Sequence, residues 1–221
     1  SIWDFARVKG IKKEKSYLSK ILFKSKFLIN SKLNFSENLL SKNDNTKAIT
    51  FISENGYKEI RSWKNLNNNV NKIANFLKKI NIKENDRVAA YMPNLIETVE
   101  AFIATASLGA IWSSCSPDFG VKGVIERFAQ IKPKILIIAD RYYYNGKEIN
   151  IIERLPAILK KIKSIKNIII VNYPGKKYLK FKKINKIKIY SWKEIRKTQT
   201  KKKEFEKFDF EQNLAILYSS G

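Results

Sequence analysis

Short apolar segments alternate with segments of helical period through the middle of the chain, between residues 62 and 172. Each apolar segment has the length of a buried strand, and the segments between them gather their apolar residues on one helical face. Strands that alternate with helices through short connections form βαβ units. This feature predicts an α/β domain with a mostly parallel sheet, whose strands lie at 86–92, 110–115, 134–139 and 167–172.

The first of the helical segments follows Ser62, which has the side chain of a helix N-cap. Apolar residues then recur at alternating intervals of three and four, which places them on one face of a helix. They are Trp63, Leu66, Val70, Ile73, Leu77 and Ile80.

The second helix is predicted to begin after Pro93, with Asn94 and Glu97 in the positions of a capping box. Gly109 suits the left-handed residue that ends a helix. The residues predicted to be buried are Leu95, Val99, Phe102, Ile103 and Ala106.

Two segments are predicted to form connections. Residues 48–54 and 56–62 have the composition of a hairpin, with Asn55-Gly56 as its two-residue turn. Residues 140–147, which read DRYYYNGK, are predicted to be a surface loop rich in aromatic side chains.

The two ends of the chain differ in character. Residues 1–45 are polar and irregular, and we predict that they wrap the domain formed by residues 46–221. Leu214–Leu217 is predicted to be a short buried strand, followed by Tyr218, Ser219, Ser220 and Gly221. Ligands bind at the carboxyl ends of strands in open α/β sheets, and small residues there let backbone N–H groups approach an anion. Taken alone, these four residues indicate a turn more strongly than a phosphate site.

Composition excludes several kinds of site from this chain. There is no histidine, so a Ser–His–Asp triad or a His-ligated zinc site cannot be built from it. Cys115 is the single cysteine and has no histidine to activate it, so a structural role is predicted rather than a nucleophile. One thiol cannot form an internal disulfide, which favours a cytoplasmic protein. No apolar segment approaches the ~20 residues that span a bilayer.

The chain carries 44 basic and 20 acidic residues, a net charge of +24. A basic nucleic-acid-binding domain is one interpretation of this charge. However, only seven of the basic residues are arginine, the side chain best suited to phosphate and guanine. The lysines are spread along the whole chain. We therefore favour a solvated basic surface, and keep nucleic-acid binding as an alternative of a different class.

Residues 29–40, 86–137 and 214–221 resemble, in that order, the N-terminal part of the adenylate-forming acyl-CoA synthetases. The phrases IWDFARVKG, IWSSCSPDFG and ADRYYYNGK are most similar to the acetoacetate-activating members of this family. The resemblance implies the N-terminal part of a large domain built from α/β subdomains, incomplete at its C-terminus. A small mobile domain follows it in the family.

The resemblance also implies a reaction in two halves. ATP and a carboxylate give an acyl-adenylate and pyrophosphate with Mg²⁺, and CoA then displaces AMP to give the thioester. The family's phosphate loop runs aromatic-Ser-Ser-Gly-Thr-Thr-Gly-x-Pro-Lys, and its first four positions match Tyr218, Ser219, Ser220 and Gly221. On this basis the chain is expected to be a fragment that is inactive alone, with no catalytic or metal-binding residue of its own.

A tentative CoA site also follows from the resemblance. Phe119, Gly120 and Gly123 match a stretch that lies near the CoA nucleotide in related acetate-activating enzymes. Tyr144 and Lys147 stand where those enzymes supply arginines to the CoA phosphates. Lys147 keeps a positive charge there, whereas Tyr144 can only stack on a base or donate its hydroxyl. Because the acyl pocket is expected beyond residue 221, an acetyl- or propionyl-CoA synthetase remains an alternative.

Overall fold

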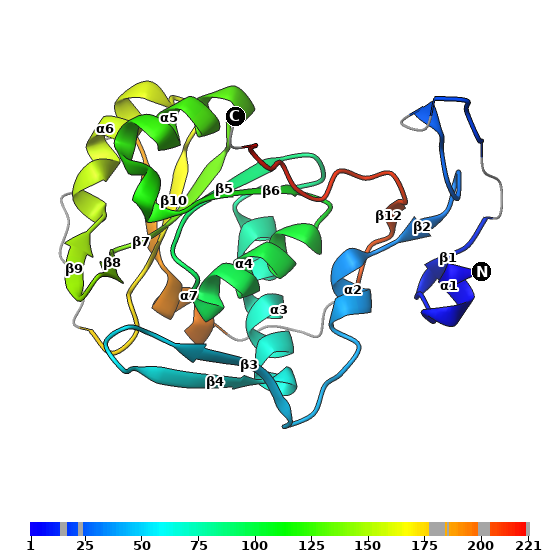
Figure 1. Cartoon of the computed structure of the whole chain (residues 1–221), viewed down its shortest axis with the longest axis horizontal. Helices are drawn as coiled ribbons and strands as arrows, with labels where there is room; N and C mark the ends of the chain where they lie inside the picture. Colours follow the sequence, from blue (N-terminus) through cyan, green and yellow to red (C-terminus); the bar gives the residue numbers. More distant parts are fainter. Residues whose placement is uncertain (14–16, 22–23, 177–183, 185, 199–203, 220–221) are drawn as a thin grey trace.

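Five parallel strands form the central sheet of the protein (Figure 1). Their order in space is β11-β10-β7-β5-β6, and every neighbouring pair is parallel, which confirms the predicted α/β fold. The order reverses between β5 and β7, the place where doubly wound sheets bind ligands. The strands are β5 (Arg87–Tyr91), β6 (Ile111–Cys115), β7 (Ile135–Ala139), β10 (Asn167–Val171) and β11 (Lys188–Ser191). The computed structural model describes all residues except 14–16, 22–23, 177–183, 185, 199–203 and 220–221.

Helices cover both faces of this sheet (Figure 1). One face carries α3 (Trp63–Lys79), α4 (Ile96–Ala106) and α7 (Trp192–Lys197), and the other carries α5 (Gly120–Ile131) and α6 (Leu155–Lys161). All five residues of β7 are fully buried. Strands covered on both sides are apolar throughout rather than alternating, which is why these strands could be located in the sequence.

The predicted start and buried face of α3 are confirmed. The Ser62 hydroxyl accepts a hydrogen bond from the Asn65 N–H at 3.2 Å, as an N-cap does. Asn69 lies among the apolar residues of the buried face, and its amide donates to Glu100 Oε1 at 2.7 Å. Of the six apolar residues predicted for that face, Leu66, Val70, Ile73 and Leu77 are buried, and Trp63 and Ile80 are partly buried against the core.

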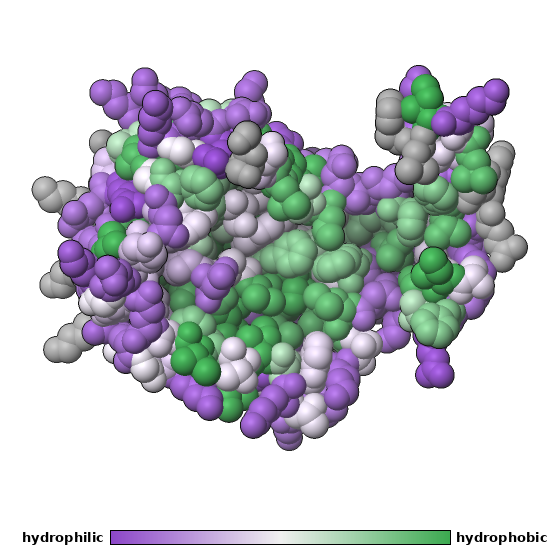
Figure 2. All heavy atoms as spheres, viewed as in Figure 1, coloured by the Kyte–Doolittle hydropathy of each residue, from purple (hydrophilic) through white to green (hydrophobic). Residues whose placement is uncertain are grey.

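The prediction for the start of α4 was wrong. Leu95 occupies the N-cap without a side-chain hydrogen bond, and Glu97 is buried instead of capping. Val99, predicted to be buried, is 39% exposed. This helix is apolar on nearly all sides, so its sequence does not define which side faces inward. Figure 2 shows the resulting hydrophobic surface over α4.

Gly109 ends the α4 segment, as predicted. Its φ of +64° is left-handed, its N–H donates to Ala106 O at 3.0 Å, and the next N–H donates to Thr105 O at 3.3 Å. These are the two hydrogen bonds of a Schellman motif, with glycine at the left-handed position.

The hairpin predicted for residues 48–62 is present, but its turn differs from the prediction. β3 (Lys47–Ile52) pairs with β4 (Lys58–Ser62), and only Gly56 in the connection is left-handed, with φ +78°. The Gly56 N–H donates to Ser53 O at 3.0 Å, and the Ser53 N–H donates to Tyr57 O at 2.9 Å. The turn is therefore a three-residue loop with a left-handed glycine, not a two-residue turn.

The segment predicted to be an aromatic loop is a second hairpin. β8 (Arg141–Tyr144) pairs with β9 (Lys147–Asn150). Asn145 and Gly146 both have positive φ, +49° and +71°, which is the geometry of a two-residue type I′ turn. The loop prediction was wrong because it did not apply the Asn-Gly rule at this position.

An ion cluster fixes the first hairpin to the helical layer. Arg61 of β4 is 5% exposed and lies 2.9 Å from carboxylate oxygens of Glu59 and Glu100. Glu97 lies 3.5 Å from Arg196 of α7 and 3.9 Å from Arg61. Burial raises the pKa of Glu100 to about 7 despite the arginine beside it. The hairpin and α4 therefore meet through charges that have little access to water, and α7 joins them through the partly exposed Arg196.

The N-terminal residues form a smaller unit at one end of the molecule (Figure 1). Asn34 caps α2, and its amide donates to Ser107 O at 3.1 Å and Glu206 O at 2.8 Å. A three-stranded antiparallel sheet joins the N-terminal segment to a strand near residue 208, while the boundary at residue 45 stays a prediction. The elements are α1 (Ile2–Phe5), β1 (Gly10–Ile11), β2 (Lys32–Leu33), α2 (Phe35–Leu39) and β12 (Phe208–Asp209).

Candidate functional site

The segment before the predicted phosphate loop lies along the edge strand β6. The Trp112 N–H donates to Leu214 O at 3.1 Å, and the Ile216 N–H donates to Trp112 O at 2.8 Å. Ala215 thereby forms a single parallel bridge with Trp112, in place of the predicted strand. Leu217 is 83% exposed, so the segment is only partly buried. Its direction carries the chain toward the carboxyl ends of the parallel strands, where ligands bind.

Tyr218 is anchored at the end of this segment. Its hydroxyl donates to Arg127 O at 3.2 Å and lies 3.2 Å from Ser113 Oγ, which is also 3.0 Å from Ile216 O. Burial raises the pKa of Tyr218. Ser219 is exposed directly beyond this anchor. Ser220 and Gly221, the other half of the predicted motif, lie outside the described residues.

The predicted CoA turn follows β6. The short 3₁₀ helix η2 (Pro117–Phe119) leads into Gly120, whose φ of +60° favours glycine. A Cβ placed on Gly120 meets no atom within 4 Å, and the Phe119 side chain is 49% exposed. The turn therefore offers open backbone beside an exposed aromatic ring.

Arg127 brings this turn and Tyr218 together. Its guanidinium carbon lies 4.0 Å from the centre of the Phe119 ring and 5.7 Å from that of Tyr218. Nη1 donates to Gly123 O at 3.1 Å, and a Cβ on Gly123 would come within 3.3 Å of that nitrogen. Sequence reasoning missed Arg127, although a spacing of four residues puts it on the same face of α5 as Gly123.

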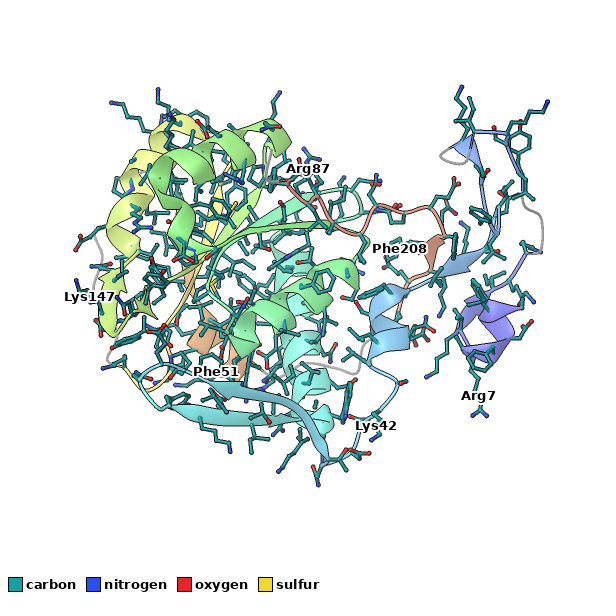
Figure 3. All side chains as sticks on the ribbon, in the orientation of Figure 1. Arg7, Lys42, Phe51, Arg87, Lys147 and Phe208 are labelled. Carbon is teal, nitrogen blue, oxygen red and sulfur yellow. The ribbon has the colours of Figure 1, made fainter. Side chains whose placement is uncertain are left out.

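Tyr144 and Lys147 are cross-strand partners at the tip of the β8–β9 hairpin. Tyr144 is 60% exposed, and Lys147 lies at the outer margin of the molecule (Figure 3). The hairpin is joined to the 117–120 turn at its base, where Tyr142 interacts with Asp118. Burial, and then that interaction, raises the pKa of Tyr142. The predicted CoA residues thus form one group around Arg127 and a second group at the hairpin tip.

A second arginine, Arg154, holds the 117–120 turn through hydrogen bonds. Arg154 Nη1 donates to Pro117 O at 2.7 Å and to the Tyr91 hydroxyl at 2.5 Å. The Tyr91 hydroxyl itself donates to Pro117 O at 3.0 Å. Tyr91 is the last residue of β5, so these bonds fix the turn over the point where the strand order reverses.

Cys115 is buried at the end of β6, and burial raises the pKa of its thiol to about 11. A thiol in this state is a poor nucleophile at neutral pH, which agrees with the predicted structural role. Among the described residues, no group of three or more Cys, Asp and Glu side chains could hold a metal ion. The helices of the described part of the chain include none that is long and apolar enough to span a membrane.

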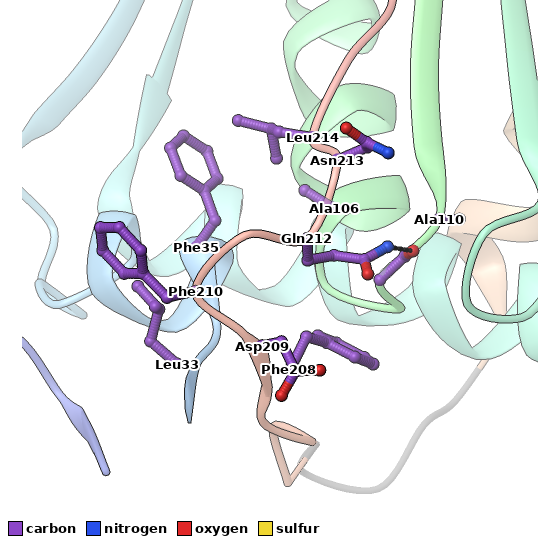
Figure 4. A pocket seen from close by; sticks show the side chains of 11 residues that line it. Leu33, Phe35, Ala106, Ala110, Phe208, Asp209, Phe210, Gln212, Asn213 and Leu214 are labelled. Atoms are coloured by element: carbon purple, nitrogen blue, oxygen red, sulfur yellow. Dashed lines mark hydrogen bonds between the residues drawn. The ribbon is translucent and has the colours of Figure 1, made fainter. Parts of the chain in front are cut away.

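A cavity of about 170 Å³ lies away from these residues, where the 208–214 segment crosses the end of α4 (Figure 4). Phe35, Phe208 and Leu214 give it a mainly apolar wall. Gln212 donates to Gly109 O at 2.8 Å, which ties the crossing segment to the helix end. We therefore interpret this cavity as a gap in the packing between the 208–214 segment and the end of α4, not as a ligand site.

The model of the AMP-binding enzyme family matches residues 37–221, so the chain belongs to that family of AMP-binding enzymes. The curated relatives it matches include acetoacetyl-CoA synthetases. That of Xenopus tropicalis is 37% identical over 99% of this chain, and that of Gallus gallus is 39% identical over 86%. The acetoacetyl-coenzyme A synthetase of Rhizobium meliloti (strain 1021) is 39% identical over 79% of this chain.

The chain is much shorter than these relatives. It covers 34%, 29% and 27% of their lengths, so it spans about a third of each. The fold agrees with a solved structure, the acetoacetyl-CoA synthetase from Streptomyces lividans, at a TM-score of 0.85. That structure is 24% identical, and the match covers all of this chain and 33% of the other.

Proposed function

We propose that this chain is the N-terminal part of an ATP-dependent acid–thiol ligase. The complete enzyme activates acetoacetate as an acyl-adenylate, releasing pyrophosphate, and then transfers the acyl group to CoA with release of AMP. The observation that carries this proposal is the identity of 36% or more to several acetoacetyl-CoA synthetases across 79–99% of the chain. The basic-domain alternative has no such support.

Tyr218 and Ser219 are proposed as the start of the loop that holds the ATP phosphates, continued by Ser220 and Gly221. The hydrogen-bonded Tyr218 hydroxyl fixes where the loop leaves the segment that lies along β6, and the exposed serine hydroxyl can donate to a phosphate oxygen. Small residues add no bulk between the backbone N–H groups and the anion. The chain's own residues thus bind and orient phosphate, while the acid-binding groups belong to the rest of the enzyme.

For CoA we propose two contacts. Phe119, Gly120 and Gly123 present an exposed ring and open backbone to the nucleotide. Tyr144 and Lys147, paired at the hairpin tip, are proposed to meet its phosphates, with Lys147 acting as a point charge and Tyr144 as a hydroxyl donor. The described residues offer no metal-ion cluster, so Mg²⁺ is proposed only as a companion of ATP. A cytoplasmic location is proposed from the single unpaired cysteine.

Carboxylate-dependent exchange of labelled pyrophosphate into ATP tests the proposal on the longer gene product. We expect exchange with acetoacetate that exceeds exchange with acetate or propionate by at least about tenfold, a difference of ~1.4 kcal/mol in transition-state binding. The 221-residue chain alone is the negative control and is expected to give none. Preference for acetate or propionate would assign a related synthetase. Malonamate is a further useful competitor, because a malonamoyl-CoA synthetase from Penicillium aethiopicum is 30% identical over 86% of this chain. Absence of exchange with every acid would contradict a ligase.

A further inference from the structure

Arg127 occupies a position between two regions that are far apart in the sequence. It lies on α5, and its main-chain oxygen accepts a hydrogen bond from Tyr218, 91 residues later. Its guanidinium covers the Phe119 ring at 4.0 Å and approaches the Tyr218 ring at 5.7 Å. One residue therefore contacts both the exposed turn and the start of the proposed phosphate loop.

The guanidinium is held in a defined orientation. Nη1 donates to Gly123 O at 3.1 Å, and the absence of a side chain at Gly123 leaves room for that contact. A planar guanidinium stacks on aromatic faces, which the round ammonium of lysine does less well. Movement of the Phe119 ring must therefore move the arginine or break the stack.

Tyr218 also contacts β6, where the Ser113 hydroxyl donates to the tyrosine hydroxyl at 3.2 Å. The 214–218 segment has only one bridge to that strand, and Leu217 is exposed. A segment with so few backbone bonds opens easily unless side chains hold its end. The Arg127 main-chain oxygen and guanidinium on α5 and the Ser113 hydroxyl on β6 supply that end contact from two different elements.

We propose that Arg127 is a positioning residue that couples the turn carrying Phe119 and Gly120 to Tyr218 at the start of the phosphate loop. The proposal rests on the proposed function for the identity of the loop, although the coupling itself is a property of this chain. A ligand that binds against the exposed Phe119 ring displaces the Arg127 guanidinium, and this displacement changes the contact of the guanidinium with the Tyr218 ring. CoA, proposed for that turn, would thereby influence the loop that has just released pyrophosphate.

Hydrogen exchange of the 221-residue chain, followed by mass spectrometry, tests the coupling directly. In Arg127→Met the amides of Trp112 and Ile216, which form the bridge, are expected to exchange at least about tenfold faster, because the guanidinium no longer contacts the Tyr218 ring at the end of this weakly bridged segment. Arg127→Lys keeps the charge but loses the planar stack, and an intermediate rate is expected. The matched control is Lys122→Met on the same helix, whose side chain is 92% exposed, and it should leave the rate unchanged. Should Arg127→Met fail to fold, Phe119→Leu removes the stack from the exposed side and should accelerate the same amides.

Activity of the longer gene product separates a positioning role from a general structural one. Arg127→Met is expected to lower kcat for acetoacetate-dependent pyrophosphate exchange about tenfold while KM for acetoacetate and the melting temperature stay unchanged, with partial recovery in Arg127→Lys. Unchanged exchange of the Trp112 and Ile216 amides, or an unchanged kcat, would overturn the proposal. A wild-type protein without pyrophosphate exchange would refute the proposed function instead, and the amide rates would then decide the coupling alone.

Discussion

Replacing Arg61 with methionine is expected to lower the free energy of unfolding at pH 8 by about 3–5 kcal/mol, the usual cost of removing one partner from a buried ion pair. Arg61 is 5% exposed and lies 2.9 Å from Glu100, which is fully buried. Without the arginine, Glu100 must stay charged in a poorly solvated place or take up a proton. Glu97 still has Arg196 as a partner at 3.5 Å in the variant. The substitution therefore removes a buried ion-pair partner mainly from Glu100. Urea unfolding followed by tryptophan fluorescence measures the change.

The loss should depend on pH in a definite direction. Burial raises the pKa of Glu100 in the folded protein to about 7 from its ordinary 4.5, so its ionisation disfavours folding as pH rises from 4.5 to 7. Removing Arg61 raises this pKa further and extends the penalty above pH 7. At pH 5.5 the carboxyl is protonated with or without Arg61, and the substitution should be milder. Lys58→Met, on the exposed side of the same strand, serves as the control. A loss below about 1 kcal/mol at pH 8 would contradict the role of the cluster.

Gly109→Ala is expected to destabilise the chain by about 2–5 kcal/mol. A left-handed alanine costs about 1–2 kcal/mol, and forcing a packed ring aside costs about 1–3 kcal/mol. The φ of Gly109 is +64°, and a Cβ there would lie 2.6 Å from Phe208 Cε1. Its carbonyl also accepts from Asn85 N and Gln212 Nε2, so displacement of the turn would disturb both bonds. The change is measured by the same urea titration.

Gly56→Ala separates the two contributions. Gly56 also has a positive φ, +78°, but a Cβ there meets nothing within 4 Å. It should therefore show only the backbone cost of about 1–2 kcal/mol. Adding Phe208→Leu to Gly109→Ala should recover part of the loss by shortening the ring that blocks the Cβ. Equal losses at the two glycines would show that contact with Phe208 is unimportant.

Four strands of the central sheet could be predicted because they are short and mainly apolar. β7 consists of Ile and Leu residues before Ala139, and β10 of Ile and Val residues after Asn167. Helix α3, which follows Ser62 and ends at Lys79, keeps a regular apolar period. Helix α4 lacks a clear difference between an apolar and a polar face. Its inward face carries Glu97 and Glu100, and their partner Arg61 lies on a hairpin that precedes it by more than 30 residues. Pairings at that distance leave no periodic trace in a single sequence.

The two Asn-Gly pairs show how local chemistry can mislead. Asn145-Gly146 forms a two-residue turn with both residues left-handed, whereas only Gly56 is left-handed in the 53–57 connection. The pair permits a type I′ turn but does not fix how many residues the loop contains. The candidate site has the same limit. Sequence resemblance proposed Tyr218 and Phe119 separately, while Arg127, which contacts both, became evident only when α5 and the C-terminal segment were seen side by side.

The coding sequence beyond the codon for Gly221 tests the central claim most directly. A phosphate loop that begins at Tyr218 predicts that it continues as Thr-Thr-Gly-x-Pro-Lys, followed by several hundred further residues. That length follows from the relatives, of which this chain covers about a third. A stop codon, or codons for an unrelated sequence, would contradict the account of this segment as the start of an ATP-binding loop.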